Sequence, residues 1–86
     1  LTVSFWYYSI GLVGGQEAFV IVWDGTNYIE ILNLGAVQNA WTNFIWTVTF
    51  DAAPQYFRTD FRLQFFSAIN GNGKVSYIDD VIISIE

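Results

Sequence analysis

Few side chains in this sequence could perform catalysis. The chain contains no cysteine and no histidine, which excludes thiol nucleophiles, imidazole bases and the usual zinc sites. Glycoside hydrolysis would need two carboxyl groups at a defined separation on either side of a sugar bond. The acidic residues that could serve are Asp24, Glu30, Asp51, Asp60 and Asp79. They are scattered over turns and strand ends, so we expect that the protein is not an enzyme and has no organic cofactor.

Aromatic side chains are the strongest functional signal. They make up 20% of the chain, and those that could meet a ligand or another subunit are Trp6, Tyr8, Trp23, Tyr28, Trp41 and Tyr56. Sugar rings pack on flat aromatic surfaces while nearby amides and carboxylates bind the hydroxyl groups. Trp and Tyr are also enriched at protein interfaces, and many of the aromatic residues must fill the core. Periodicity does not separate the sugar-binding interpretation from the interface interpretation.

The composition indicates a surplus of apolar surface. Hydrophobic residues make up 53% of the 86 residues and charged residues 13%, whereas about 25% charged is usual. A chain this short buries a smaller share of its surface than a large domain does, so some apolar side chains should face a partner. The net charge of −5 with three cations argues against nucleic acid. No apolar run approaches the length of a membrane helix, about 20 residues, so we expect no membrane insertion.

The periodicity is that of strands, with no helical repeat. Six strands are predicted, at 1–9, 17–24, 28–34, 40–50, 60–67 and 75–86. The second is almost wholly apolar, which predicts burial on both faces or cover by a neighbour. The predicted connections are a Gly14-Gly15 link, an Asp24-Gly25 hairpin turn, a loop at 35–39, a crossover at 51–59 and a turn at 70–73. Together they predict one antiparallel β-sandwich over 1–86 without a linker.

The alternation also predicts which side chains form the core. The inward-facing residues that we expect there are Val3, Phe5, Val20, Val22, Phe44, Trp46, Val48, Leu63, Phe65, Val81 and Ile83.

Several motifs follow one another in the second half of the chain. They are WTVTFD at 46–51, FRLQF at 61–65, the Gly/Asn turn at 70–73 and YIDDV at 77–81. This series resembles the galactose-binding-like carbohydrate-binding modules and the MAM domains of cell-surface proteins, and the opening LTVSFWYY is similar to an early core strand of that group. The resemblance implies a sandwich of jelly-roll type and an extracellular or cell-surface location.

The sequence departs from that group at its beginning. Members start with one or two strands that these 86 residues lack, and Leu1 is expected to be a processed or excised end. We therefore expect a sheet edge that is open or is filled by another chain.

The resemblance further implies a structural calcium ion at Asp79 or Asp80. Calcium needs six to eight oxygen ligands, and adjacent strand residues point to opposite faces unless a bulge intervenes. The alternative is that one aspartate accepts a backbone hydrogen bond while the other is solvated. Both interpretations stay open at this point.

Two functional hypotheses follow from the sequence. The first is a non-enzymatic extracellular module that self-assembles with other copies through sheet edges and aromatic faces, as a structural subunit of a fibre or surface assembly. Its adhesive surface would lie around Trp6, Tyr8, Trp41 and Ile82. The alternative is a carbohydrate-binding module that stacks a polysaccharide on exposed Trp and Tyr. It predicts two or three coplanar rings in an open groove beside Asn or Gln.

Overall fold

The computed structural model describes residues 1–12, 18–69 and 73–85, and within them the fold is all-β. The elements are β1 (Thr2–Ile10), β2 (Ala18–Trp23), β3 (Tyr28–Asn33), β4 (Thr42–Thr47), the 3₁₀ turn η1 (Pro54–Tyr56), β5 (Leu63–Ser67) and β6 (Val75–Ser84). Each of the six strands corresponds to a strand predicted from the sequence, and η1 lies in the predicted crossover at 51–59. The Gly14-Gly15 link, positions 70–72 of the predicted turn and Glu86 lie outside the described residues.

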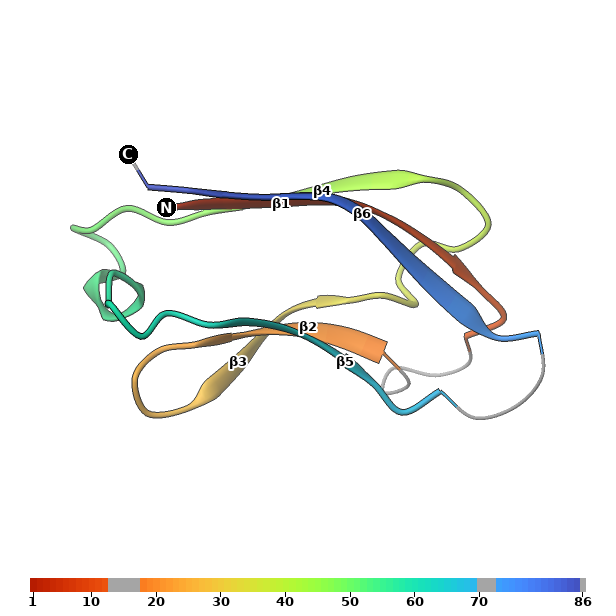
Figure 1. Cartoon of the computed structure of the whole chain (residues 1–86), viewed down its shortest axis with the longest axis horizontal. Helices are drawn as coiled ribbons and strands as arrows, with labels where there is room; N and C mark the ends of the chain where they lie inside the picture. The colour runs from red at the N-terminus through yellow and green to blue at the C-terminus, as the bar shows by residue number, and fades with distance from the viewer. Residues whose placement is uncertain (13–17, 70–72, 86) are drawn as a thin grey trace.

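The strands form two three-stranded antiparallel sheets that lie one above the other (Figure 1). Their strand orders are β4-β1-β6 and β3-β2-β5. The predicted hairpin joins β2 to β3, and its turn is closed by a hydrogen bond from the Asp24 backbone N–H to the Asn27 carbonyl. The β3–β4, β4–β5 and β5–β6 connections pass between sheets. The sandwich-like all-β prediction is therefore confirmed.

Strand β1 carries the centre of the core. Its burial alternates along the strand, because successive side chains of a strand point to opposite faces. Val3, Phe5 and Tyr7 are buried, and Phe5 is fully enclosed. The Phe5 ring lies 5.3 Å from the Phe44 ring of the same sheet and 5.2 Å from the Phe65 ring of the opposite sheet. One side chain thus contacts both layers.

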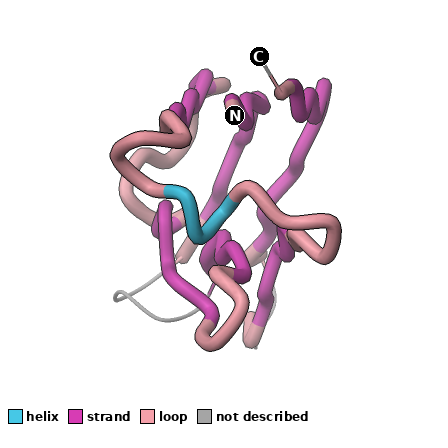
Figure 2. Tube along the Cα trace, turned by 90° about the vertical axis from the view of Figure 1, so that its left-hand side faces the viewer, coloured by secondary structure: helices cyan, strands magenta, loops and turns pink. Residues whose placement is uncertain are grey.

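A second hydrophobic cluster closes one end of the molecule. It contains Leu1, Val22, Ala53 and Tyr56. The crossover at 51–59, which includes η1, runs across this end (Figure 2). Its Tyr56 ring contacts the Trp46 ring edge to face.

The core prediction is right for the central strands and wrong for β6. Val3, Phe5, Val20 and Val22 have no exposed surface. Partly buried residues that pack against the two clusters are Phe44, Trp46, Val48 and Leu63. In contrast, Val81 is 45% exposed and Ile83 47%. Phe65 contacts Phe5 but is 37% exposed.

The exposure of these residues follows from the sheet edges. β5 and β6 are edge strands, so each has a neighbour on one side only. β5 spans 5 residues while β6 spans 10, and β6 therefore extends past the strand that should cover it. β2 is the central strand of its sheet, and yet its outward residues Phe19, Ile21 and Trp23 are only half-buried. Of the two arrangements predicted for this apolar strand, burial on both faces is therefore wrong.

A bulge interrupts β6 in its middle. Ser4 pairs with Ile82 and Trp6 pairs with Asp79, so that Phe5 alone opposes both Asp80 and Val81. Two residues against one is the definition of a β-bulge. Asp80 adopts a φ of 55°, the left-handed region that an aspartate tolerates better than a branched residue does.

Candidate functional site

The outer face of the β4-β1-β6 sheet gathers half of the aromatic candidates. We call the residues Trp6, Tyr8, Trp41 and Tyr77 the Trp6 face. Trp6 and Trp41 are 43% and 51% exposed. Tyr8 pairs with Tyr77 across β1 and β6, and its ring lies 5.6 Å from that of Trp41. Antiparallel register, and not proximity in the sequence, assembles this surface.

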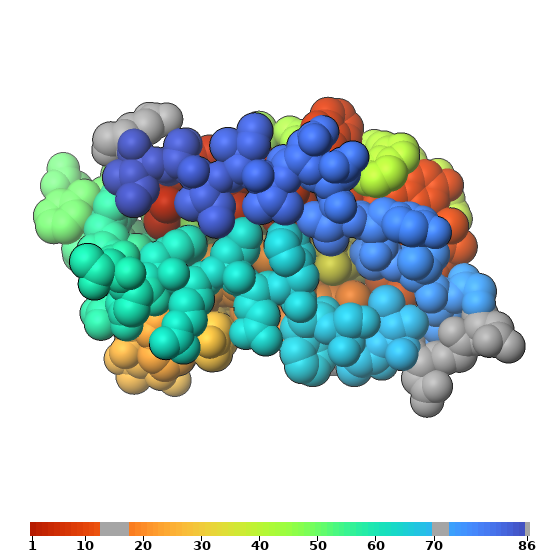
Figure 3. Space-filling model, in the orientation of Figure 1, coloured from red at the N-terminus to blue at the C-terminus, as the bar shows by residue number. Residues whose placement is uncertain are grey.

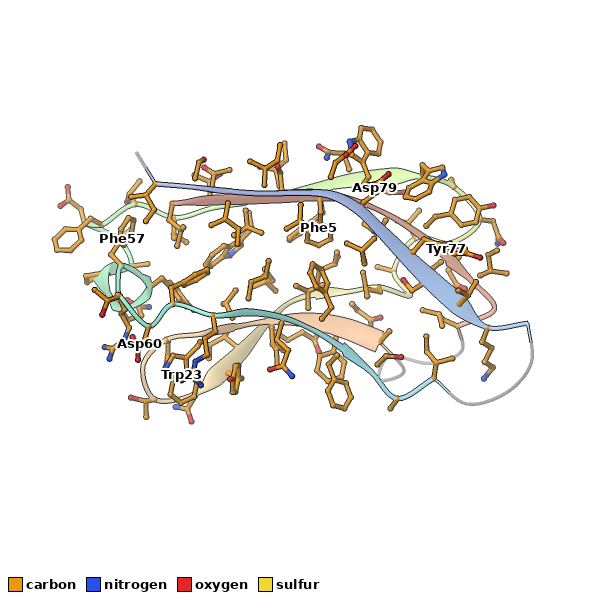
Figure 4. All side chains as sticks on the ribbon, viewed as in Figure 1. Phe5, Trp23, Phe57, Asp60, Tyr77 and Asp79 are labelled. Atoms are coloured by element: carbon orange, nitrogen blue, oxygen red, sulfur yellow. The ribbon has the colours of Figure 1, made fainter. Side chains whose placement is uncertain are left out.

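Trp6 has a polar residue on each side. Asn43 of β4 and Asp79 of β6 are its partners in register, so all three side chains share the outer face. Directly opposed side chains lie about 5 Å apart at Cβ. Figure 4 shows Asp79 on the outer side of the upper sheet, with Phe5 between the two sheets. The row combines an exposed indole with an amide and a carboxylate, which are groups that bind hydroxyls.

The rings on this face do not form a flat platform. The planes of Tyr8 and Trp41 make an angle of 58°. A sugar-stacking surface needs coplanar rings, so this pair does not meet the geometry expected for the carbohydrate hypothesis.

A different set of groups surrounds Trp23 and Tyr28 on the outer face of the other sheet. Their rings are 4.8 Å apart at an angle of 54°. The Arg62 guanidinium lies 5.6 Å above the Trp23 ring and donates to the Tyr28 hydroxyl at 3.5 Å. Arg62 therefore occupies one face of the indole by a cation–π contact, which leaves less of Trp23 for a ligand.

The hairpin turn beside Trp23 is tied to the crossover by Arg58. Arg58 Nε donates to Asp60 Oδ1 at 2.6 Å. The Arg58 guanidinium also rests on Gly25, where a Cβ would lie 2.6 Å from it, and Gly25 has a φ of +100°. Glycine is thus required at this turn for both its backbone angle and its lack of a side chain. Figure 4 shows Asp60 and Trp23 close together at this end.

Two carboxyl groups in this region are held in their ionised form. Hydrogen bonding from the Arg58 guanidinium is the main cause that lowers the pKa of Asp60 below its ordinary 3.8. Backbone N–H groups of Asn27 and Thr26 donate to Asp24 Oδ1 and lower the pKa of Asp24 in the same way. The Arg58 and Asp60 side chains are 43% and 44% exposed, so the pair contributes little to stability.

Tyr56 belongs to the core. It is only 8% exposed and meets the Trp46 ring edge to face at 5.1 Å. A ring in this position has no open face for a sugar or a partner. The prediction that Tyr56 is a ligand or interface residue is therefore wrong.

The Asp79-Asp80 pair does not form a calcium donor set by itself. Asp79 Oδ1 accepts the Asp80 backbone N–H at 2.9 Å, which stabilises the bulge. Among residues 1–12, 18–69 and 73–85, no three His, Cys, Asp or Glu side chains lie close enough to share a metal ion. Two adjacent carboxylates fall short of the six to eight oxygens that calcium takes. The geometry supports the backbone role of Asp79, and calcium binding stays an untested prediction.

The two edge strands β5 and β6 lie on the same side of the molecule. We call this region the open side and define it by Phe65, Val81, Ile83 and Ile85. Figure 3 shows β6 in blue above β5 in turquoise, with atoms of the inner strands visible between them. Ile85 is the most exposed of the four, at 74%. Core-facing side chains therefore reach the surface here.

A small cavity opens between the same two strands. Its volume is about 90 Å³, and side chains that line it include Ala18, Leu34, Phe65, Ile69, Ser76 and Ile78. Ligand pockets are usually several times larger, about 300 to 1,000 Å³. The cavity is therefore of a size for a single apolar side chain rather than for a sugar or a cofactor.

The structure also reveals surface aromatics that were not among the sequence candidates. Tyr77 is 53% exposed beside Tyr8, and the rings of Phe19 and Phe66 stack 4.6 Å apart at 22° on the other sheet. Alternation places Phe66 outward, but its partner depends on which strands are neighbours. That pairing has no signal in the local sequence.

Comparison with protein-family models, with curated protein sequences and with solved structures finds no match to this chain. The residue motifs at 46–51, 61–65 and 77–81 thus remain the basis of the proposed resemblance. The described part of the chain contains no helix with the length and apolar character needed to cross a membrane.

Asp80 provides a test of the bulge. Replacing Asp80 with Val should destabilise the fold by about 1–2 kcal/mol, because a branched residue resists a positive φ. Asp80→Gly should retain or raise stability, since glycine adopts this angle freely. Chemical denaturation of the two variants measures the difference. Equal stabilities would show that the strand does not bulge at Asp80.

The Arg58–Asp60 pair provides a test by titration. Because its pKa is lowered in the folded state, Asp60 contributes stability above its unfolded pKa, and this is lost as the pH falls through the folded pKa. Arg58→Gln should raise the pKa of Asp60 toward its ordinary value, as followed by NMR of the carboxyl carbon. Arg62→Gln should raise it less, because Arg62 donates to the Tyr28 hydroxyl rather than to Asp60. An unchanged Asp60 pKa in Arg58→Gln would contradict the assignment.

Proposed function

We propose that this protein is a structural module that associates with other copies of itself through the open side. The observation that carries the proposal is the exposure of core-facing residues on two edge strands at one side of the sandwich, above all Val81 and Ile83. Exposed apolar surface of this kind marks an interaction site in soluble proteins. Strand addition at such an edge satisfies the free backbone groups and covers the side chains together.

The edge of β6 has little protection against such pairing. Natural edge strands are usually guarded by Lys, Pro or bulges. Residues 75–84 contain no Lys and no Pro, and the bulge at Asp80 is the protective feature present. It divides β6 into an N-terminal part and an apolar C-terminal part.

Jelly-roll topology would account for the open side. A jelly roll places eight strands in two sheets, whereas each sheet here has three strands. We propose that the six strands are the later part of this fold, with one position vacant beside β6 and one beside β5. The extracellular or cell-surface location belongs to the same proposal and rests on the resemblance. A non-enzymatic role without an organic cofactor is likewise proposed from the residue inventory.

A matched pair of substitutions tests which surface mediates association. Ile82 and Ile45 both flank Ser4 on the outer face of the same sheet, on opposite edge strands. Their exposures are 60% and 62%. Ile82→Lys should weaken association by at least about tenfold in dissociation constant, because it places a charge on the pairing edge. Ile45→Lys should leave association unchanged. Light scattering across a dilution series measures both.

Each other outcome has a defined meaning. Equal weakening by both substitutions would assign the contact to the outer face of the β4-β1-β6 sheet instead of the β6 edge. A wild-type chain that is monomeric at every concentration would refute self-association.

Carbohydrate binding is the second candidate, and one observation favours it. Trp6 is exposed between Asn43 and Asp79 in one row of the sheet, which would let a sugar stack on the indole while its hydroxyls bind the flanking groups. The tilt of the neighbouring rings weighs against an extended platform.

The carbohydrate candidate predicts that Trp6→Ala abolishes binding to a panel of soluble glycans. Phe50→Ala is the control, because Phe50 is equally aromatic, 62% exposed and outside the Trp6 face. Calorimetry measures the binding, and a wild-type chain that binds no glycan of the panel would remove the candidate.

A further inference from the structure

The C-terminal part of β6 is an uncharged, exposed run. It consists of Val81, Ile82, Ile83 and Ser84, and Ile85 extends it by one residue past the end of the strand. Its side chains are 45% exposed at Val81, 60% at Ile82, 47% at Ile83 and 74% at Ile85. β1 pairs with one side of this run, with Val3 opposite Ile83 and Ser4 opposite Ile82. The other side of the run is the edge of the sheet.

The sequence of this run suits pairing with itself. By register, Ile83 lies on the inner face opposite Val3, while Ile82 and Ser84 lie on the outer face. Alternation along the chain then places Val81 and Ile85 on the inner side. If two antiparallel copies meet with Ile83 opposite Ile83, then Val81 lies opposite Ile85 and Ile82 opposite Ser84. Every inward apolar residue then meets an inward apolar residue. The two sandwiches lie side by side, and their cores become continuous.

Charge selects this register over pairing along the whole strand. If all of 75–84 paired with its own copy, Asp79 would lie opposite Asp80 of the second copy, and like charges directly opposite are destabilising. The bulge at Asp80 also bends the strand at that point. With Ile83 at the centre, Asp79 and Asp80 lie beyond the paired run.

We propose, on the basis of the proposed function, that two copies of this chain pair antiparallel through Val81–Ile85, with a two-fold axis at Ile83. The product is one six-stranded sheet in the order β4-β1-β6-β6-β1-β4, and the second copy is the occupant of this edge. A five-residue strand pair buries less than the roughly 800 Å² per partner of a standard interface. The dimer is therefore reversible, and it strengthens with salt because each copy carries a net charge of −5.

Single cysteines test the register, because the chain has none of its own. Side chains directly opposite each other on paired strands lie about 5 Å apart at Cβ, close to disulfide geometry. Ile83→Cys should form a disulfide dimer on mild oxidation. Val81→Cys and Ile85→Cys should each cross-link poorly alone and should form a mixed dimer when combined. Ile45→Cys, on the opposite edge and similarly exposed, is the control.

Light scattering of the wild type separates the failure of this inference from failure of the proposed function. The inference is supported if Ile83→Cys and the mixed pair give several-fold more disulfide dimer than Ile45→Cys, with wild-type β content by circular dichroism. Association of the wild type without those cross-links would overturn the register and leave self-association standing. Stronger cross-linking of Val81→Cys alone than of Ile83→Cys would also overturn it. A monomeric wild type would overturn both the register and the proposed self-association.

Discussion

The packing of Phe5 between the two sheets is the contact on which the rest of the structure depends. β1 is the central strand of its sheet, with β4 on one side and β6 on the other. Its inward residues must therefore meet the opposite sheet. Phe5 does so with rings from both layers around it and with no surface exposed to water. Truncation of such a buried ring typically costs about 3–5 kcal/mol, a large part of the stability of a small domain.

The same arrangement explains why the molecule is closed at its centre and open at one side. Central strands have neighbours on both sides, so their inward residues are enclosed from every direction. Edge strands lack a neighbour, and their inward residues are covered from below only where the opposing strand is long enough. β5 is half the length of β6. The open side is thus a geometric consequence of pairing a long edge strand with a short one.

Polar groups in this protein mainly shape the backbone. Asp79 supports the bulge through the Asp80 amide, and Asp24 binds two amides of the β2–β3 turn. Arg58 of the crossover lies against Gly25 of that turn and donates to the nearby Asp60. Large apolar side chains such as Trp41, Ile45 and Ile82 are more than half exposed. The association that we propose would take its direction and its register from the alternation of β6.

The sequence by itself determined the properties that are local to each strand. The two-residue period placed Val3, Phe5, Val20 and Val22 inward, and turn residues such as Asp24-Gly25 marked the strand ends, because both effects act over a few neighbouring residues. The lack of cysteine and histidine is likewise a property of the chain alone.

Tertiary structure decided what covers each face. Tyr56 is buried because the crossover folds under Trp46. Val81 and Ile83 are exposed because β6 is an edge strand. Trp6 lies between Asn43 and Asp79 through pairings that span tens of residues. Alternation fixes the direction in which a side chain points, but burial depends on which distant segment lies opposite.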